Sequence, residues 1–316
     1  MTAELAISIG AIIGATLRPQ PRERVHGGSI NECYRWETDS GAIFVKVAPV
    51  RNIEMFAAEA AGLEALRRAN AVRVPRVLGV GCSGAAAVTV GAGTHNGTDA
   101  RERPSSAVRA WLALEWIQTG PATHTTDTTL GEQLAKQHRA TQTSFGWSRD
   151  NTIGSTPQLN AESPDWITFY RDLRLQYQLD LAAKNGFNGR LQDRGATLLD
   201  CLPHFFRTRK PTPSLLHGDL WGGNRLTDNN GQPVIFDPAV YYGDREADIA
   251  MTHLFGGYGK DFYAAYEAAW PRDPGHEVRA DLYNLYHVLN HLNLFGGGYL
   301  RQATGMIDRL LAEAGR

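Results

Sequence analysis

A change of periodicity along the chain constrains its fold more than any other feature of the sequence. In the first third, short runs of β-formers such as residues 42–47 surround one long run of helix formers at residues 53–68. After Gly120-Pro121, a pair that interrupts regular structure, apolar side chains recur at helical spacing. We therefore predict a mixed α+β protein of two lobes, with a β-rich lobe over residues 1–118 and a mainly helical lobe over residues 119–316.

The same patterns predict further elements. We expect strands at residues 72–80, 85–90 and 110–117, a surface hairpin tip at residues 91–107, and an amphipathic helix within residues 1–17. Three apolar stripes predict helices in the second lobe, and Gly296 would end the last of them. The stripes comprise Leu130, Leu134 and His138; Trp166, Phe169, Tyr170, Leu173 and Tyr177; and Leu282, Leu285, Tyr286, Leu289 and Leu292.

The composition excludes several classes of protein. The 316 residues include 32 basic and 33 acidic side chains, for a formal net charge of -1, and 42% are apolar, which argues against a disordered chain. The balanced charge gives no electrostatic reason to expect nucleic acid or an anionic membrane as a partner, and no stretch approaches the roughly 20 apolar residues of a membrane span. Cys33, Cys82 and Cys201 have neither disulfide-framework nor metal-site spacing, which favours a reducing cytoplasm.

A short hairpin is predicted at residues 224–237, where Asn230-Gly231 suits a two-residue type I′ turn. The register would pair Asn229 with Gln232, Leu226 with Ile235, and Asn224 with Asp237. The amide oxygen of Asn224 and the carboxylate of Asp237 would then lie side by side at the open end. Such hard oxygen ligands suit Mg²⁺, which completes its coordination shell with phosphate oxygens and water.

Asp219 lies five residues before Asn224, in the segment HGDLWGGN. A carboxylate beside a metal could accept the proton of an attacking hydroxyl, and an Asp, an Asn five residues later and a second Asp after a short hairpin form the arrangement of a kinase catalytic loop. The alternative is a polar, glycine-rich loop whose Asp and Asn side chains only stabilise turns.

Lys46 interrupts an apolar strand, and Glu59 lies on the apolar stripe of the following helix with Met55, Phe56 and Leu63. Each charge needs a partner if it is buried, so we predict a Lys46–Glu59 ion pair that would direct the ammonium toward phosphates. The alternative is a solvated lysine on an edge strand and an exposed glutamate. Upstream, Gly27 and Gly28 could let backbone N–H groups approach phosphates, but two adjacent glycines are also common in ordinary turns.

These segments together resemble the fructosamine kinase family, also called ketosamine-3-kinases, within the aminoglycoside-phosphotransferase and protein-kinase-like superfamily, and bacterial members in particular. The resemblance runs in order over most of the chain, and Trp221, the Asp-Pro-Ala at residues 237–239 and the DNTIG segment are its most specific parts. The matching segments are FVKV at 44–47, MFAAEAAGLEALR at 55–67, FGW and DNTIGSTPQLN within 145–160, HGDLWGGN at 217–224, and FDPAVYYGDREADIA at 236–250.

The resemblance implies a two-lobed kinase-like fold that binds ATP between the lobes, with Mg²⁺ as the second cofactor. It implies that Asp219 is the catalytic carboxylate, that Asn224 and Asp237 are the metal ligands, and that Lys46, held by Glu59, contacts phosphates. The phosphate loop would comprise Gly27, Gly28, Ser29, Ile30 and Asn31, and the adenine hinge would comprise Glu115, Trp116 and Ile117. Asp248 would brace the catalytic loop through its backbone N–H groups, and His217 would support the same loop.

The implied reaction is ATP-dependent phosphorylation of the 3-hydroxyl of a fructosamine or ribulosamine, free or on a protein lysine, which is a deglycation activity. Candidate substrate contacts are Trp221, whose alternative role is packing, and the helix residues His287, Asn290 and His291. Two alternatives stay open: a related kinase acting on an aminoglycoside, choline or homoserine, and an ATP-binding pseudokinase. We expect a cytoplasmic enzyme, a monomer rather than an oligomer.

Overall fold

The computed structural model describes residues 2–21, 23–25, 31–84 and 108–316, which divide into two compact units. One unit takes residues 1–67 and 74–118, and the other takes residues 68–73 and 119–316. The sequence predicted one boundary, but the short segment 68–73 belongs with the helical unit. The reason is local, because Arg73 forms a parallel bridge with Val234 and an ion pair with Asp228.

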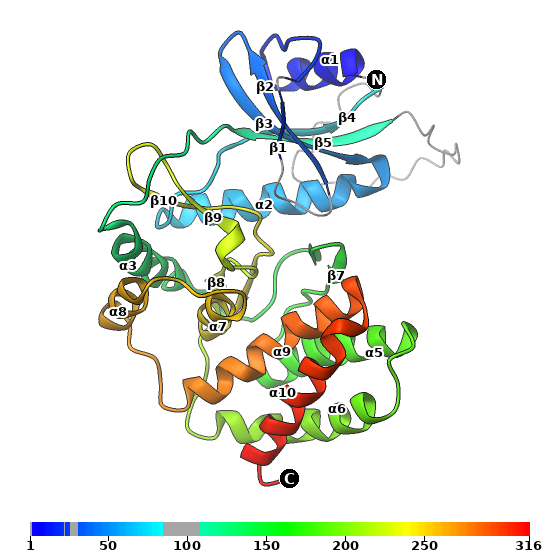
Figure 1. The fold of residues 1–316 in the computed structure, drawn as a ribbon, viewed down its shortest axis with the longest axis vertical. Coiled ribbons are helices and arrows are strands. Elements are labelled where there is room, and N and C mark those ends of the chain that lie inside the picture. Colours follow the sequence, from blue (N-terminus) through cyan, green and yellow to red (C-terminus); the bar gives the residue numbers. More distant parts are fainter. Residues whose placement is uncertain (1, 22, 26–30, 85–107) are drawn as a thin grey trace. The chain divides into compact units, whose positions relative to one another are not determined.

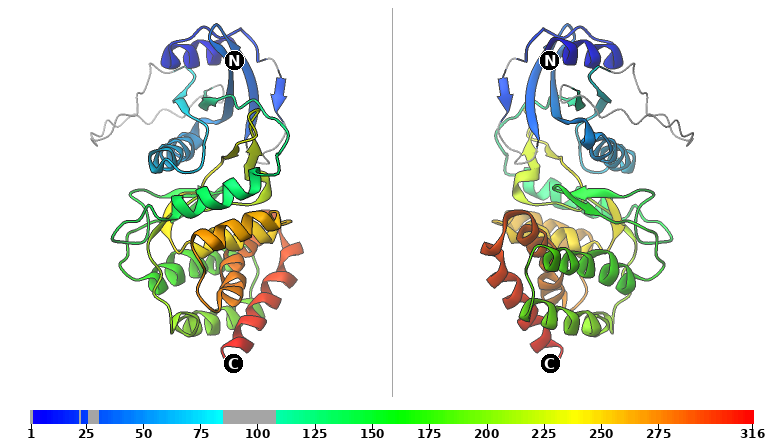
Figure 2. Two further views of the ribbon diagram at one scale, coloured as in Figure 1. Left: turned by 90° about the vertical axis from the view of Figure 1, so that its left-hand side faces the viewer. Right: turned by 90° about the vertical axis from the view of Figure 1, so that its right-hand side faces the viewer.

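The first unit is built on an antiparallel five-stranded sheet in the order β1-β2-β3-β5-β4 (Figure 1). Helices α1 and α2 lie on opposite sides of this sheet (Figure 2). Alternation along β3 places Val45 and Val47 in a core with Ile9 of α1, while Lys46 points to the other face, toward α2. The elements are α1 (Thr2–Ile13), β1 (Glu23–Val25), β2 (Glu32–Thr38), β3 (Gly41–Pro49), α2 (Ile53–Ala69), β4 (Val77–Cys82) and β5 (Arg109–Glu115).

The second unit is mainly helical, with short two-stranded ladders between its helices. Helix α9, the longest, packs against α5, α7 and α10, and its stripe of Leu282, Leu285 and Leu289 is buried as predicted. The helices are α3 (Thr126–His138), α4 (Trp166–Tyr170), a π-helix (Arg171–Gln176), α5 (Tyr177–Lys184), α6 (Arg190–Cys201), α7 (Glu246–Leu254), α8 (Lys260–Ala269), α9 (His276–Phe295) and α10 (Leu300–Glu313). The ladders pair β6 (Asn151–Ile153) with β7 (Thr156–Gln158), β8 (Ser214–Leu216) with β11 (Tyr241–Gly243), and β9 (Arg225–Thr227) with β10 (Pro233–Ile235).

The α+β class with a β-sheet unit and a helical unit is confirmed, but some local predictions are wrong. Residues 72–76 are not a strand, since Pro75 has no N–H to donate to a ladder and β4 begins only at Val77. The predicted strand at 85–90 and hairpin tip at 91–107 lie outside the described residues. No helix of the described part is long and apolar enough to cross a membrane.

The stripe from Trp166 to Tyr177 departs from its predicted phase. Leu173 and Tyr177 are only partly buried, whereas Arg174 and Gln178, the next residue in each case, are fully buried. The cause is the π-helical stretch Arg171–Gln176, whose wider turn rotates the following residues relative to an α-helix.

The hairpin of β9 and β10 forms, but with a different turn and register from the prediction. Leu226 pairs with Val234 rather than Ile235, and Asn230 does not have the positive φ that a type I′ turn requires. Instead the buried carboxylate of Asp228 accepts the N–H groups of Asn230 and Gln232, and only Gly231 is left-handed, with φ of 77°. This arrangement is typical of a type I turn followed by a glycine bulge. It shifts every pair by one residue, so Phe236 rather than Asp237 bonds to the backbone of Asn224.

Candidate active site

The loop between β8 and β9 brings Asp219 and Asn224 together. A 3₁₀ turn at Gly222–Asn224 folds the chain back, so that Asn224 Nδ2 donates to Asp219 Oδ2 at 3.1 Å and to the Asp219 carbonyl at 2.9 Å. The same nitrogen lies 3.5 Å from the carbonyl oxygen of Asp237. The three residues that the sequence grouped therefore meet at one point of the helical unit. Asn224 and Asp237 are not a ladder pair as predicted; instead the side-chain amide of Asn224 contacts the backbone of Asp237.

Two backbone positions make this close approach possible. Asp237 has φ of 56°, a left-handed conformation that is uncommon outside glycine and is often found at functional sites. Gly218 has φ of 82°, and a Cβ placed there would lie 2.0 Å from the Ala239 carbonyl oxygen. Only glycine therefore fits at position 218, where the loop touches the segment that follows Asp237.

The electrostatics of the loop suit a proton acceptor beside a cation. Burial, and next the charge of Asp237, raise the pKa of Asp219 to about 7, while the hydrogen bond from Asn224 opposes the rise. Adjacent carboxylates and an amide provide the hard oxygen atoms that Mg²⁺ prefers, so these residues fit that metal. The described residues hold no cluster of three His, Cys, Asp or Glu side chains suited to a metal, and a cation here would complete its shell with phosphate and water.

Asp248 on α7 holds the start of the loop. Its two carboxylate oxygens accept the backbone N–H groups of His217 at 2.7 Å and Gly218 at 2.8 Å, and His138 Nε2 lies 3.2 Å from it. Burial alone would raise the pKa of Asp248, but the contact with His138 and these N–H groups hold it below its usual value. These are the backbone contacts that the resemblance implied for Asp248.

His217 is a buried support for the loop. Its Nε2 lies 2.9 Å from the Phe236 carbonyl, and its Nδ1 accepts the backbone N–H of Asp219 at 3.3 Å. Burial lowers the pKa of His217, and both of its ring nitrogens are engaged in hydrogen bonds.

In the sheet unit, Lys46 and Glu59 form the ion pair that the helix stripe predicted. Lys46 Nζ lies 2.7 Å from Glu59 Oε1, and both side chains are largely buried. Glu115 ends β5, the Trp116 ring lies beneath the guanidinium of Arg35 at 4.9 Å, and Ile117 is buried. Gly27, Gly28, Ser29 and Ile30 lie outside the described residues, and Asn31 directly precedes β2.

Two of the four predicted substrate residues, Trp221 and His291, contact the ring of Phe255 in the helical unit. The edge of Trp221 meets Phe255 with ring centroids 6.3 Å apart, and His291 stacks on Phe255 at 4.7 Å. Burial lowers the pKa of His287 to about 3, so this ring is neutral. Asn290 is buried, and its amide bonds to the Ile153 carbonyl and to Gln178, which makes it a link between α9, β6 and α5.

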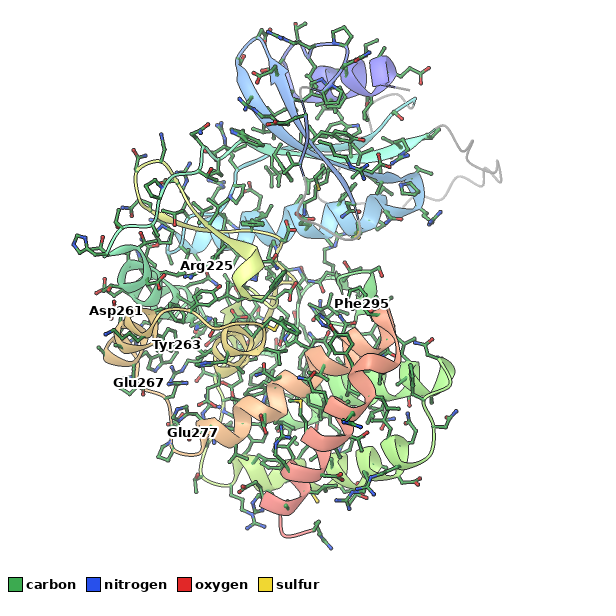
Figure 3. All side chains as sticks on the ribbon, in the orientation of Figure 1. Arg225, Asp261, Tyr263, Glu267, Glu277 and Phe295 are labelled. Carbon is green, nitrogen blue, oxygen red and sulfur yellow. The ribbon has the colours of Figure 1, made fainter. Side chains whose placement is uncertain are left out.

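Sequence reasoning missed two features near this loop. Arg225, which is labelled in Figure 3, directly follows Asn224. It pairs with Asp127 at 2.7 Å and lies 4.0 Å over the Tyr258 ring. Arg174 is completely buried against the aromatic rings of Phe169 and Tyr241. The one sequence signal for Arg174 was its position next to an apolar stripe. An α-helical period would place Arg174 on the solvent-exposed face.

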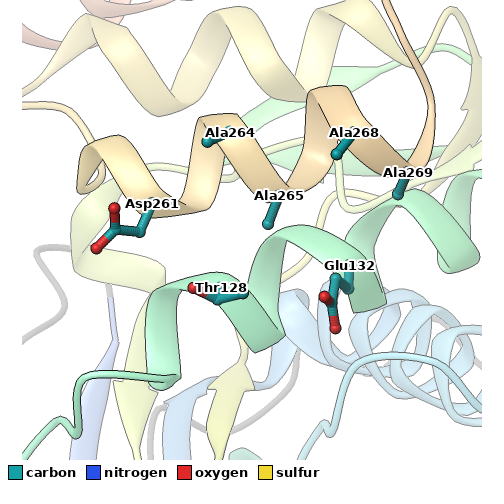
Figure 4. A pocket seen from close by; sticks show the side chains of 7 residues that line it. All are labelled: Thr128, Glu132, Asp261, Ala264, Ala265, Ala268 and Ala269. Carbon is teal, nitrogen blue, oxygen red and sulfur yellow. The ribbon is translucent and has the colours of Figure 1, made fainter.

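A surface groove between α3 and α8 is separate from these residues. It has a volume of about 500 Å³ and an alanine-rich floor with Glu132 and Asp261 at its sides (Figure 4). It contains none of the predicted site residues.

The family model for fructosamine kinases matches residues 1–313. The chain belongs to the fructosamine kinase family. It is 41% identical over 308 residues to a probable ketoamine kinase of Synechocystis, covering 97% of this chain and 96% of that protein. It is 42% identical over 289 residues to the chloroplastic protein-ribulosamine 3-kinase of Arabidopsis thaliana, covering 91% of this chain and 81% of that protein.

Similar solved structures support the same family assignment. A crystal structure from Thermobifida fusca assigned to the fructosamine-3-kinases matches with a TM-score of 0.78 and 29% identity, over 98% of each chain. An aminoglycoside phosphotransferase in complex with ADP and hygromycin B matches with a TM-score of 0.60 and 14% identity, over 98% of each chain, which shows the shared fold. The protein is thus an ATP-dependent phosphotransferase with a protein-kinase-like fold.

Proposed function

We propose that this protein phosphorylates the 3-hydroxyl of ketosamines, using ATP and Mg²⁺, and that this activity initiates deglycation. The observation that carries the proposal is the contact of Asn224 with both Asp219 and the backbone of Asp237, on a loop braced by Asp248. The similarity to a probable ketoamine kinase of Synechocystis and to a protein-ribulosamine 3-kinase of Arabidopsis thaliana supports ketosamines as the substrate class.

In the proposed mechanism, Asp219 orients the sugar hydroxyl and accepts its proton as the oxygen bonds to the γ-phosphorus and the bond to ADP breaks. A pKa of about 7 is favourable for such a base, because it is then largely ionised at slightly alkaline pH and still basic enough to take a proton. Asn224 and Asp237 would hold Mg²⁺, which supplies positive charge to the transferring phosphoryl group. Lys46, fixed by Glu59, would contact the phosphates from the sheet unit.

The finer assignments are part of the same proposal. Burial lowers the pKa of His287 to about 3 and also lowers the pKa of His291. These residues suit a sugar adduct better than a polycationic antibiotic, for which a site lined with carboxylates would be expected. The substrate is a free ketosamine or a glycated protein lysine, and Gly27 to Asn31 and Glu115 to Ile117 would bind the nucleotide. We place the enzyme in the cytoplasm as a monomer. The cytoplasm suits three cysteines that lack the spacing of a disulfide framework.

The test compares phosphorylation of ribulose-lysine, fructose-lysine and kanamycin with ATP, read by the mass gain of one phosphoryl group. We expect turnover of at least one ketosamine and none of kanamycin. Asp219→Ala and Asp237→Ala should each lower turnover by about two orders of magnitude or more while the fold persists. Turnover of kanamycin alone would refute the proposed substrate class, and a folded Asp219→Ala variant with most of its activity would refute the role of Asp219.

A further inference from the structure

The strained backbone at Asp237 is followed by a segment that side-chain amides hold in place. Gln158 Nε2 donates to the carbonyl of Ala239 at 3.0 Å, and Asn151 Nδ2 donates to the carbonyl of Val240 at 2.8 Å. Both amides come from the β6–β7 hairpin. A non-glycine residue with positive φ persists only where its surroundings determine it strongly, and these two bonds fix the chain immediately after Asp237.

Each side-chain amide can donate a hydrogen bond to a backbone carbonyl only if its nitrogen faces that carbonyl. The two bonds therefore depend on which way the amide groups are oriented. Asn151 Oδ1 accepts hydrogen bonds from Gln158 Nε2 at 2.8 Å and from Asn160 Nδ2 at 2.9 Å. Asn160 Oδ1 in turn accepts from Arg174 Nη2 at 2.7 Å. An arginine side chain has donors and no acceptor, and it therefore dictates which way Asn160 points and, through it, Asn151.

Within the described part of the chain, the surroundings of Arg174 are aromatic rings and hydrogen-bond acceptors rather than carboxylates. Its side chain is fully buried on the π-helix, and its guanidinium lies 4.2 Å from the centre of the Tyr241 ring. Across the described residues, no carboxylate lies within 4.0 Å of it to form a salt bridge. Its hydrogen bonds go to Asn160 and to the carbonyls of Leu159 and Leu173. A buried cation without an acidic partner is costly to keep, which argues that its donors serve a purpose.

We propose that Arg174 is a positioning residue that acts through Asn160, Asn151 and Gln158 to fix the backbone after Asp237, and so sets the Asp237 carboxylate for the metal that accompanies ATP. The proposal rests on the proposed function, in which Asp237 is a metal ligand. Outer residues that orient a metal ligand commonly change metal affinity about 10- to 100-fold when they are replaced.

The test uses the full-length protein with Mn²⁺ and ADP as the probe, and measures Mn²⁺ binding by electron paramagnetic resonance. Arg174→Met removes the donors, and we expect it to weaken Mn²⁺ binding about tenfold. Arg174→Lys keeps a side chain that only donates, and it should restore most of that loss. Hydrogen exchange at residues 237–243 should become faster in Arg174→Met and stay near wild type in Arg174→Lys.

The Asn160→Asp variant distinguishes a positioning role of Arg174 from a role in packing alone. It replaces the donor toward Asn151 with an acceptor but keeps a partner for Arg174, so it should weaken Mn²⁺ binding as Arg174→Met does without a comparable fall in melting temperature. Unchanged Mn²⁺ binding in folded Arg174→Met and Asn160→Asp would overturn the proposal. The binding measurement needs no ketosamine, so the two proposals can fail separately. A wild-type protein that binds Mn²⁺–ADP but phosphorylates no ketosamine refutes only the proposed substrate. A wild-type protein that does not bind Mn²⁺–ADP refutes both the proposed function and the proposed role of Arg174.

Discussion

Replacing Asp248 with asparagine tests whether the loop that carries Asp219 depends on one buried carboxylate. Asp248 is 1% exposed, and one oxygen accepts the His217 N–H while the other accepts the Gly218 N–H. In Asp248→Asn, one oxygen becomes an NH₂ group that faces a backbone donor. The variant loses a charge-assisted hydrogen bond, about 1.5–3 kcal/mol, and leaves a buried N–H without an acceptor, about 1–3 kcal/mol. We therefore expect the free energy of unfolding to fall by roughly 2.5–6 kcal/mol.

The assay combines urea unfolding of the helical unit with single-turnover kinetics at low temperature, where the variant is still folded. We also expect faster hydrogen exchange at residues 217–219 and turnover at least about tenfold lower, because Asp219 follows the freed backbone. Asp308→Asn is the matched control, since Asp308 forms surface ion pairs with Arg190 and Arg194 and should cost less than about 1 kcal/mol. Equal stability and turnover in the two variants would refute the reasoning.

Three further outcomes follow from the structure. Lys46→Met should lower turnover by roughly a hundredfold and leave the melting temperature of the helical unit unchanged; steady-state kinetics with normal turnover would contradict the role of Lys46. Gly218→Ala should destabilise the protein by more than the roughly 1–2 kcal/mol of a left-handed backbone, because its Cβ would meet the Ala239 carbonyl at 2.0 Å; urea unfolding measures this. Burial lowers the pKa of His287 to about 3, whereas its pKa in the unfolded chain is about 6.5. Below pH 6.5 the unfolded chain therefore takes up a proton that the folded protein does not, and the free energy of unfolding falls by about 2 kcal/mol by pH 5. His287→Gln should flatten that fall in unfolding experiments between pH 7 and 5.

Features that depend on short-range spacing could be predicted from the sequence. The alternation of β3 and the stripe of α2 are local properties, and together they required Lys46 and Glu59 to face each other. The five-residue separation of Asp219 and Asn224 is likewise closed by a single turn. The change from strand to helical periodicity after Gly120-Pro121 predicted the division into a β-rich and a helical part, and the resemblance to the fructosamine kinase family implied the same division.

The register of the β9–β10 hairpin could not be predicted in this way. Asn230-Gly231 suits a two-residue turn. However, the Asp228 carboxylate accepts the N–H groups of Asn230 and Gln232 and is itself paired with Arg73, 155 residues earlier. That distant partner favours a longer turn. A shift of one residue in a hairpin exchanges the faces of its side chains, so a contact far away in sequence decided which residues meet.

By itself, the sequence determined the elements whose causes lie within a few residues: the strand that carries Lys46, the helix that carries Glu59 and the loop of Asp219. Only the tertiary structure decided the turn at Asp228, the phase of the π-helix and the burial of Arg174. The physical reason is that side chains such as Arg174 and Asp228 can be satisfied in several local ways. Which way is lowest in free energy depends on donors, acceptors and aromatic rings that arrive from distant parts of the chain.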